Sequence, residues 1–202
     1  VGRGVDDGLV ADAMRTVPRE AFVDPGYEAF AYDDRPLPIG EGQTISQPYT
    51  VARMIEAAAL RGGEKVLDIG AGSGYAAAIA GRIADHVYAI ERHASLAQAA
   101  RLRLSALGYD NIDIRIGDGT KGWAEHAPFD VILVAASAPE IPTALKQQLA
   151  IGARLVIPTG LDERSQVLRK VTRLTETEYD TEDIGAVVFV PLIGEQGWRQ
   201  ER

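Results

Sequence analysis

Short apolar runs alternate with amphipathic stretches along most of this chain of 202 residues. Runs such as KVLDIG, HVYAIE and FDVILVAA are apolar at most positions rather than at every second one, which is typical of strands buried on both faces of a parallel sheet. The stretches between them repeat apolar residues at helical spacing and often end in glycine. Strands are therefore expected at residues 65–70, 86–91, 112–119, 129–136, 154–160, 166–174 and 186–192, and helices at 72–84, 94–108 and 139–152.

The last two expected strands are joined by the polar stretch TETEYDTEDIG, residues 175–185. This connection is too short for the crossover of about a dozen or more residues that parallel neighbours need. We therefore expect the last two strands to pair antiparallel. Together with the alternation before them, this predicts an α/β fold: a doubly wound, mostly parallel, Rossmann-like sheet with an antiparallel C-terminal strand pair.

The first part of the chain follows a different pattern. Residues 6–15 are expected to form a short helix, and residues 31–43 are rich in Pro, Gly and Asp and are expected to be a loop. A helix should begin near Pro48, where the missing N–H costs little. Its apolar stripe is formed by Val51, Met54, Ile55 and Ala58. We expect one domain over residues 1–202, with 1–47 as an N-terminal helical extension and 48–202 as the sheet core.

A glycine-rich turn lies where the first expected strand becomes a helix, in VLDIGAGSGY. Gly70, Gly72 and Gly74 let the backbone turn sharply and let a ligand approach closely. A tight turn without a ligand is the simpler interpretation of such glycines. The spacing is GxGxG, whereas a dinucleotide fingerprint needs GxGxxG, and Tyr75 occupies the place of its third glycine. The Gly-Lys-Ser/Thr of a P-loop is absent.

Three acidic residues lie at the ends of successive strands: Asp68, Glu91 and Asp118. Ligands of open α/β sheets bind beyond the carboxyl ends of the strands. Glu91 is placed to accept from ribose hydroxyls, Asp118 from an adenine amino group, and Asp68 suits a cationic or amino-bearing group. A ligand with a ribose, an adenine and a positive charge but no phosphate is S-adenosylmethionine.

Composition narrows the remaining classes of function. The chain has no cysteine, which excludes disulfides and thiolate chemistry, and its three histidines are not spaced as metal ligands, so no metal is expected. The formal net charge of −8 makes nucleic acid an unlikely partner. No apolar stretch has the length of a membrane span or a signal peptide, so we expect no membrane partner and a cytoplasmic location.

Several motifs resemble those of the protein-L-isoaspartate O-methyltransferase family, and the resemblance covers nearly the whole chain. VLDIGAGSGY alone marks the broader superfamily of methyltransferases, whereas GQTISQPY and APEIP are more specific to this family. The matching motifs are VPREAFV (17–23), GQTISQPY (42–49), VLDIGAGSGY (66–75), APEIP (138–142), GARLVIPTG (152–160) and VFVPL (188–192).

The resemblance implies an enzyme that transfers a methyl group from S-adenosylmethionine to the free carboxylate of L-isoaspartyl and D-aspartyl residues in damaged proteins and peptides, leaving S-adenosylhomocysteine. The ester then cyclises to a succinimide, which starts repair. By matching motif, Ser46 is the active-site serine. The implied cofactor residues are Thr44, Ile45, Asp68, Gly70, Gly72, Gly74, Glu91, Asp118 and Gly119, and the implied substrate residues are Ala136, Ser137, Ala138 and Pro139.

Some alternatives stay open at this point. Ser46 precedes a helix, where a serine is more often a cap than a catalyst; the family motif favours a hydroxyl that donates to the substrate carboxylate. Ser137 stands where the family usually has alanine, and the chain begins late relative to the family. The rival functions are a methyltransferase of another small carboxylate and a module that binds S-adenosylmethionine without isoaspartyl activity. A monomer is expected.

Overall fold

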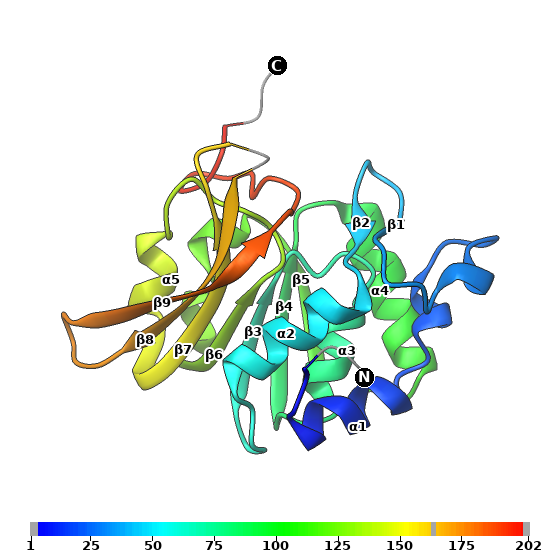
Figure 1. Ribbon diagram of the computed structural model, residues 1–202, viewed down its shortest axis with the longest axis horizontal. Coiled ribbons are helices and arrows are strands. Elements are labelled where there is room, and N and C mark those ends of the chain that lie inside the picture. The colour runs from blue at the N-terminus through cyan, green and yellow to red at the C-terminus, as the bar shows by residue number, and fades with distance from the viewer. Residues whose placement is uncertain (1–3, 163–164, 200–202) are drawn as a thin grey trace.

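The computed structural model describes residues 4–162 and 165–199. A seven-stranded sheet with the order β5-β4-β3-β6-β7-β8-β9 forms its centre (Figure 1). Strands β3 to β7 run parallel, in agreement with the expected α/β fold. They span Lys65–Ile69 (β3), His86–Glu91 (β4), Ile112–Ile116 (β5), Phe129–Val134 (β6) and Leu149–Thr159 (β7).

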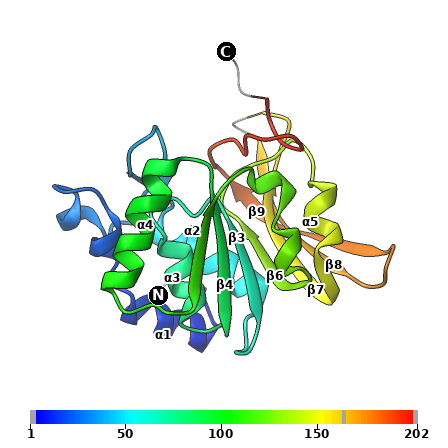
Figure 2. The same ribbon diagram turned by 180° about the vertical axis from the view of Figure 1, so that it is seen from behind.

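Two apolar layers cover the two faces of the sheet. Helices α2 (Pro48–Ala58), α3 (Tyr75–Gly81) and α4 (Ala94–Ala106) pack on one face, and α1 (Gly8–Thr16) packs on α2 and α3 (Figures 1 and 2). The short helix α5 (Thr143–Gln147) packs on the other face. Near α5 lie the 3₁₀ turns η3 (Gly119–Lys121) and η4 (Ala124–His126). Successive side chains of a strand point to opposite faces of the sheet. In β3, Val66 accordingly packs in the first layer and Leu67 in the second.

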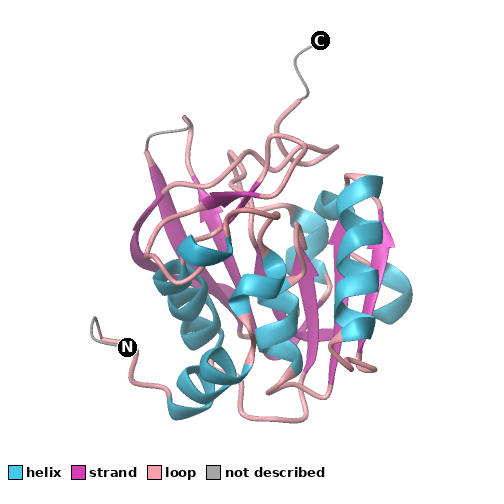
Figure 3. Cartoon of the chain, turned by 90° about the vertical axis from the view of Figure 1, so that its right-hand side faces the viewer, coloured by secondary structure: helices cyan, strands magenta, loops and turns pink. Residues whose placement is uncertain are grey.

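The chain changes direction across the sheet beside β3. It runs outward from β3 through β4 to β5, and then returns to β6 on the other side of β3. The carboxyl ends of β3 and β6 therefore face the crevice in which α/β sheets bind ligands. In Figure 3 the loops gather at one end of the sheet, and the C-terminal part of the chain crosses that end.

The C-terminal strands pair antiparallel, as expected, but the last one lies earlier in the chain than residues 186–192. Strand β8 (Gln166–Arg173) pairs with β7, and β9 (Tyr179–Val187) pairs with β8 at the sheet edge. The polar stretch is strand because an edge strand needs little apolar burial. Its acidic side chains pair across the hairpin, with Arg169 to Asp183 at 2.9 Å and Lys170 to Glu182 at 2.6 Å.

The helix expected over residues 139–152 is much shorter in the structure. Only Thr143–Gln147 is helical, and β7 begins at Leu149, which is fully buried and pairs with Phe129. The sequence LAIG, residues 149–152, instead forms the beginning of β7. Pairing with β6 buries its leucine as completely as a helix would. Tertiary pairing therefore overrides the helical spacing of this segment.

The N-terminal extension reaches over the carboxyl end of the sheet. After α1 come the 3₁₀ turns η1 (Arg19–Phe22) and η2 (Glu28–Phe30) and the small hairpin of β1 (Leu37–Pro38) and β2 (Thr44–Ile45). The region expected to be a loop thus includes β1. In Figure 1 this hairpin stands beside the upper end of the sheet, above α2 and near α4.

Candidate active site

The glycine turn between β3 and α3 needs its glycines for two different reasons. Gly70, Gly72 and Gly74 all have positive φ, at 82°, 52° and 89°, where other residues are strained. A side chain at position 72 would also lie 3.0 Å from Cδ1 of Ile39 in the hairpin. A side chain at position 74 would instead meet Leu104 of α4 at 3.2 Å. Gly72 lets the hairpin approach the turn, and Gly74 lets α3 pack closely on α4.

Two cavities lie against this turn, and a groove adjoins them. The first cavity lies between the hairpin, the turn and the C-terminal segment; the second lies under the start of α2, and the groove opens between the loop before α2 and residues 188–191. Thr44 and Ala135 line all three spaces. The first cavity is also lined by Gly70, Gly72, Glu91, Gly117, Gly119, Ala136 and residues 190–193, and the second by Ile45, Ser46, Asp68, Gly70 and Gly72.

Asp68 is a buried carboxylate without a partner. It is fully buried near the end of β3 and lines the second cavity, and neither of its carboxylate oxygens accepts a hydrogen bond within the described structure. Burial, and then the negative charge of Glu91, raise the pKa of Asp68 to about 7. A desolvated carboxylate is costly unless it is paired, so this position suits a cationic group of a ligand.

Glu91 stabilises the turn from the end of β4. Its side chain is buried and lines the first cavity, and it accepts from the backbone N–H of Gly72 at 2.8 Å and of His93 at 2.9 Å. A carboxylate offers about four acceptor positions, so these two bonds leave room for hydroxyl groups of a ligand. His93 also lines this cavity, and its buried Nε2 has no hydrogen-bond partner among the residues that the structure describes.

Asp118 lies beside the first cavity but its carboxylate does not line it. The carboxylate accepts from the backbone N–H and the hydroxyl of Thr120, at 2.9 and 2.7 Å, and from the backbone N–H of Glu195 at 2.9 Å. Burial alone would raise the pKa of Asp118, but these hydrogen bonds outweigh it and lower the pKa. Its neighbours Gly117 and Gly119 line the cavity instead, so an adenine contact through the Asp118 side chain stays a prediction.

Ser46 does not cap the helix that follows it. Gln47 is the N-cap of α2, and no side chain makes a capping hydrogen bond there. Ser46 is half-buried and lines both the second cavity and the groove. Its backbone carbonyl accepts from Arg19 at 2.8 Å. Of the two interpretations of this serine, the cap has no counterpart within the described residues, and the residue itself lies where the two spaces adjoin.

The loop after β6 lies only partly along these spaces. Ala136 lines the first cavity, but Ser137, Ala138 and Pro139 line neither cavity nor the groove. Ser137 is buried under the C-terminal segment, where its N–H donates to Val190 at 2.8 Å and its carbonyl accepts from Leu192 at 2.7 Å. The contact of residues 137–139 with substrate stays a prediction, and their visible role is to hold the C-terminal segment.

Sequence reasoning missed two parts of the cavity walls. Ala135, directly after β6, could have been found from the rule that ligands lie beyond strand ends. Residues 188–192 form the VFVPL motif and Ile193 follows it; the motif marked the family but gave no sign that the chain turns back over the glycine turn. Hydrogen bonds from the backbone of residues 195 and 196 to Asp118 and Thr120 fix that return.

The residues present fit S-adenosylmethionine. The unpartnered oxygens of Asp68 suit its ammonium group, and Glu91 suits its ribose hydroxyls. Within residues 4–162 and 165–199, no three His, Asp or Glu side chains come together as ligands for a metal ion. No helix in those ranges is long and apolar enough to cross a bilayer.

Comparison with known proteins identifies the family of this chain. Residues 2–197 match the family described as Protein-L-isoaspartate(D-aspartate) O-methyltransferase (PCMT). A protein-L-isoaspartate O-methyltransferase of Brucella anthropi is 56% identical over 98% of this chain and 91% of its own length. The corresponding protein of Rhodopseudomonas palustris is 53% identical over the same shares.

Solved structures give the same result. A structure of a protein-L-isoaspartate O-methyltransferase is 29% identical, with a TM-score of 0.87 over 95% of this chain and 63% of that chain. A putative protein-L-isoaspartate O-methyltransferase of Plasmodium falciparum, solved in complex with S-adenosyl-L-homocysteine, is 28% identical, with a TM-score of 0.79 over 95% of this chain and 93% of that chain. The chain therefore belongs to the protein-L-isoaspartate(D-aspartate) O-methyltransferase family.

Proposed function

We propose that the two cavities together hold S-adenosylmethionine and that Ser46 presents the carboxylate of an isoaspartyl residue from the groove. Membership of the family makes the chain a methyltransferase that acts on proteins carrying isoaspartyl residues. The observation that carries the proposal is the position of Ser46, which lines both the second cavity and the open groove. A group held there borders the cofactor on one side and a peptide on the other.

Four features of the chain would hold the cofactor. Asp68 takes the ammonium of the methionine part, Glu91 takes the ribose hydroxyls, and Gly70 and Gly72 allow the backbone to approach closely. Gly119 supports the wall beside the adenine. The cofactor supplies an electrophilic methyl group on a sulfonium.

The side chains near Ser46 indicate how the carboxylate is held. A substrate carboxylate has a pKa of roughly 4 and is ionised at neutral pH, so no general base is needed. At the start of α2, Pro48 has no N–H, and the N–H of Tyr49 donates to Asp34 at 3.2 Å. The hydroxyl of Ser46 lies in the wall of the groove and makes no other hydrogen bond within the described residues, so it is a donor that can hold the carboxylate without giving up another bond. Orientation and exclusion of water then supply the rate.

The proposal has further parts that concern the whole protein. D-aspartyl residues are a second substrate, because the family description names D-aspartate as well. The chain acts as a single domain and as a monomer, in the cytoplasm. Size-exclusion chromatography with light scattering tests the monomer; a mass of twice 21.7 kDa would contradict it.

The test is transfer of labelled methyl groups to an isoaspartyl peptide and to its normal aspartyl twin. We expect methylation of the first peptide only. Ser46→Ala removes a hydrogen bond to a charged group, worth about 1.5–3 kcal/mol, so kcat/KM should fall about ten- to a hundredfold. Affinity for S-adenosylhomocysteine and the urea midpoint should not change, because Ser46 caps nothing.

The matched control is Ser105→Ala, an exposed serine of α4, which should keep the normal rate. Equal methylation of both peptides would point to a carboxylate methyltransferase of another kind. Cofactor binding without transfer to either peptide would leave only a binding module. A Ser46→Ala variant with normal kcat/KM would remove the proposed role of this hydroxyl.

A further inference from the structure

A buried arginine lies behind the serine of the active site. Arg19, in the 3₁₀ turn η1, has no exposed surface. Its Nη2 donates to the backbone carbonyl of Ser46 at 2.8 Å, and its Nε donates to the carbonyl of Ala31 at 2.6 Å. Burial lowers the pKa of the Arg19 guanidinium, and its Nη1 has no hydrogen-bond partner within the described structure. The side chain thus joins two loops that are distant in sequence.

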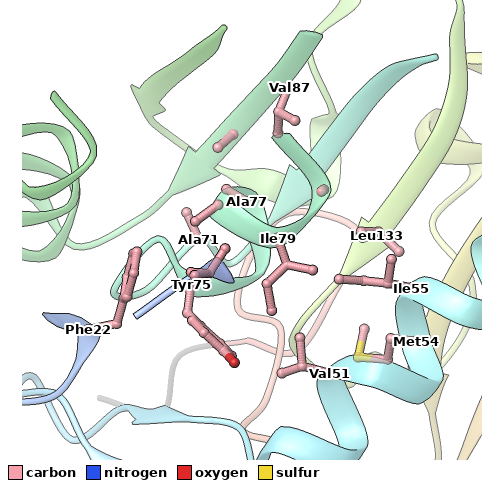
Figure 4. Packing of buried hydrophobic residues seen from close by; sticks show 14 of the residues in the cluster. Phe22, Val51, Met54, Ile55, Ala71, Tyr75, Ala77, Ile79, Val87 and Leu133 are labelled. Atoms are coloured by element: carbon pink, nitrogen blue, oxygen red, sulfur yellow. The ribbon is translucent and has the colours of Figure 1, made fainter. Parts of the chain in front are cut away.

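The same guanidinium reaches the helix that follows the glycine turn. It lies over the ring of Tyr75 at 4.6 Å from the ring centroid, and Tyr75 is the first residue of α3. Tyr75 is buried and lines the second cavity together with Ser46. Figure 4 shows its ring beside that of Phe22, and the two centroids are 5.4 Å apart. Arg19 therefore contacts both the loop that carries Ser46 and the helix behind the cofactor turn.

Stability alone does not account for a cation at this place. Replacing buried charged groups by well-packed apolar side chains is often neutral or stabilising. An arginine differs from such side chains because its planar fork donates in fixed directions. Two of its N–H groups donate to backbone carbonyls, and these bonds hold the two carbonyls in fixed positions relative to each other.

The charge itself has little to contribute to the reaction. The substrate carboxylate loses its charge as it accepts the methyl group, so a cation beside it would stabilise the starting state more than the transition state. In this structure the guanidinium donates to neutral carbonyls. Its geometry, rather than its charge, is the property that the active site can use.

We propose that Arg19 is a positioning residue that fixes Ser46 against the cofactor turn. The inference rests on the proposed function of Ser46. The fork fixes the backbone of Ser46, and the ring of Tyr75 fixes the fork, so the hydroxyl meets the carboxylate at the correct place beside the methyl group. Arg19 touches neither substrate nor cofactor and acts through Ser46.

The test is a double-mutant cycle of Arg19→Lys with Ser46→Ala. Lysine keeps the positive charge but cannot make the two directed bonds of the fork. We expect Arg19→Lys to lower kcat/KM for the isoaspartyl peptide about tenfold, with the affinity for S-adenosylhomocysteine within about twofold of the wild type. In the Ser46→Ala background the same change should cost less than about twofold, because residues that act as one unit are not additive.

Several results would overturn the inference. A full tenfold loss in the Ser46→Ala background would mean that Arg19 acts only on the general structure, and a normal rate for Arg19→Lys would mean that it positions nothing. If the lysine variant does not fold, Arg19→Met takes its place in the cycle. Peptide affinity in the presence of S-adenosylhomocysteine, measured by fluorescence anisotropy, gives the same cycle without turnover. A wild type that fails to methylate the peptide refutes the proposed function instead.

Discussion

Binding of S-adenosylhomocysteine should release a proton from Asp68. The unliganded carboxyl has a pKa of about 7, because it is buried and faces the charge of Glu91. An ammonium group beside it would favour the charged form and lower that pKa. With a pKa of about 7, about a tenth of the molecules have Asp68 ionised at about pH 6, and about nine-tenths at about pH 8. The apparent affinity should therefore rise about tenfold between these two values.

Isothermal titration calorimetry can measure both the affinity and the proton. Titrations with S-adenosylhomocysteine in phosphate and in imidazole, which both buffer in this range and differ in ionisation enthalpy, give the number of protons released. We expect the release of nearly one proton per bound ligand at about pH 6 and of almost none at about pH 8. Asp68→Asn cannot ionise, so its affinity should be about ten- to a hundredfold lower at about pH 8 and independent of pH. Equal wild-type affinities at the two values, or a pH dependence that survives in Asp68→Asn, would refute the assignment.

The same carboxyl should make the unliganded protein less stable as the pH rises. Its pKa is raised in the folded state from 3.8 to about 7, so its contribution is fully present below about pH 4 and is lost as the pH rises through 7. At about 1.4 kcal/mol for each of roughly three units, the loss is on the order of 4 kcal/mol. The stability of Asp68→Asn relative to wild type should therefore increase from about pH 5 to about pH 8 in urea denaturation. A constant difference would contradict this reasoning.

Three further predictions test the walls of the first cavity. Glu91→Gln removes the negative charge near Asp68, so the pH at the midpoint of the change in affinity for S-adenosylhomocysteine should move below 7. An unchanged midpoint would show that burial alone sets the pKa of Asp68. Gly119→Ala places a Cβ 2.4 Å from a buried side chain of β3, and it should cost about 1–3 kcal/mol of unfolding free energy in urea; a wild-type midpoint would contradict the tight contact. Asp118→Ala should speed amide exchange at Glu195 even without cofactor, because the carboxylate accepts from that N–H, and unchanged exchange would mean that other contacts hold the segment.

The parallel part of the fold could be predicted because its strands are apolar runs that alternate with helices. The errors lie where tertiary pairing decides. Strand β9 can be polar at most positions because it is an edge strand with one exposed side. Its composition therefore resembles that of a loop. Leu149 is buried whether its segment is a helix or a strand, and only pairing with Phe129 makes it a strand.

The same distinction applies to the site. Asp68 and Glu91 could be located from sequence because a strand end fixes both their position and their direction. The side chain of Asp118 could not be oriented, since its hydrogen-bond partner Glu195 is 77 residues away in the chain. The sequence placed Arg19 in the VPREAFV motif but could not predict its contacts, because they lie in three separate segments of the chain.

The return of the C-terminal segment affects the order in which the site can form during synthesis. The first cavity takes walls from Ile39, near the start of the chain, and from residues 190–193, near its end. A ribosome makes the N-terminal part first, and contacts between distant segments must wait for the later one. A nascent chain that ends before residue 190 has the glycine turn but lacks one wall of the cavity, so cofactor cannot be enclosed until residues 190–193 have been made and have folded back.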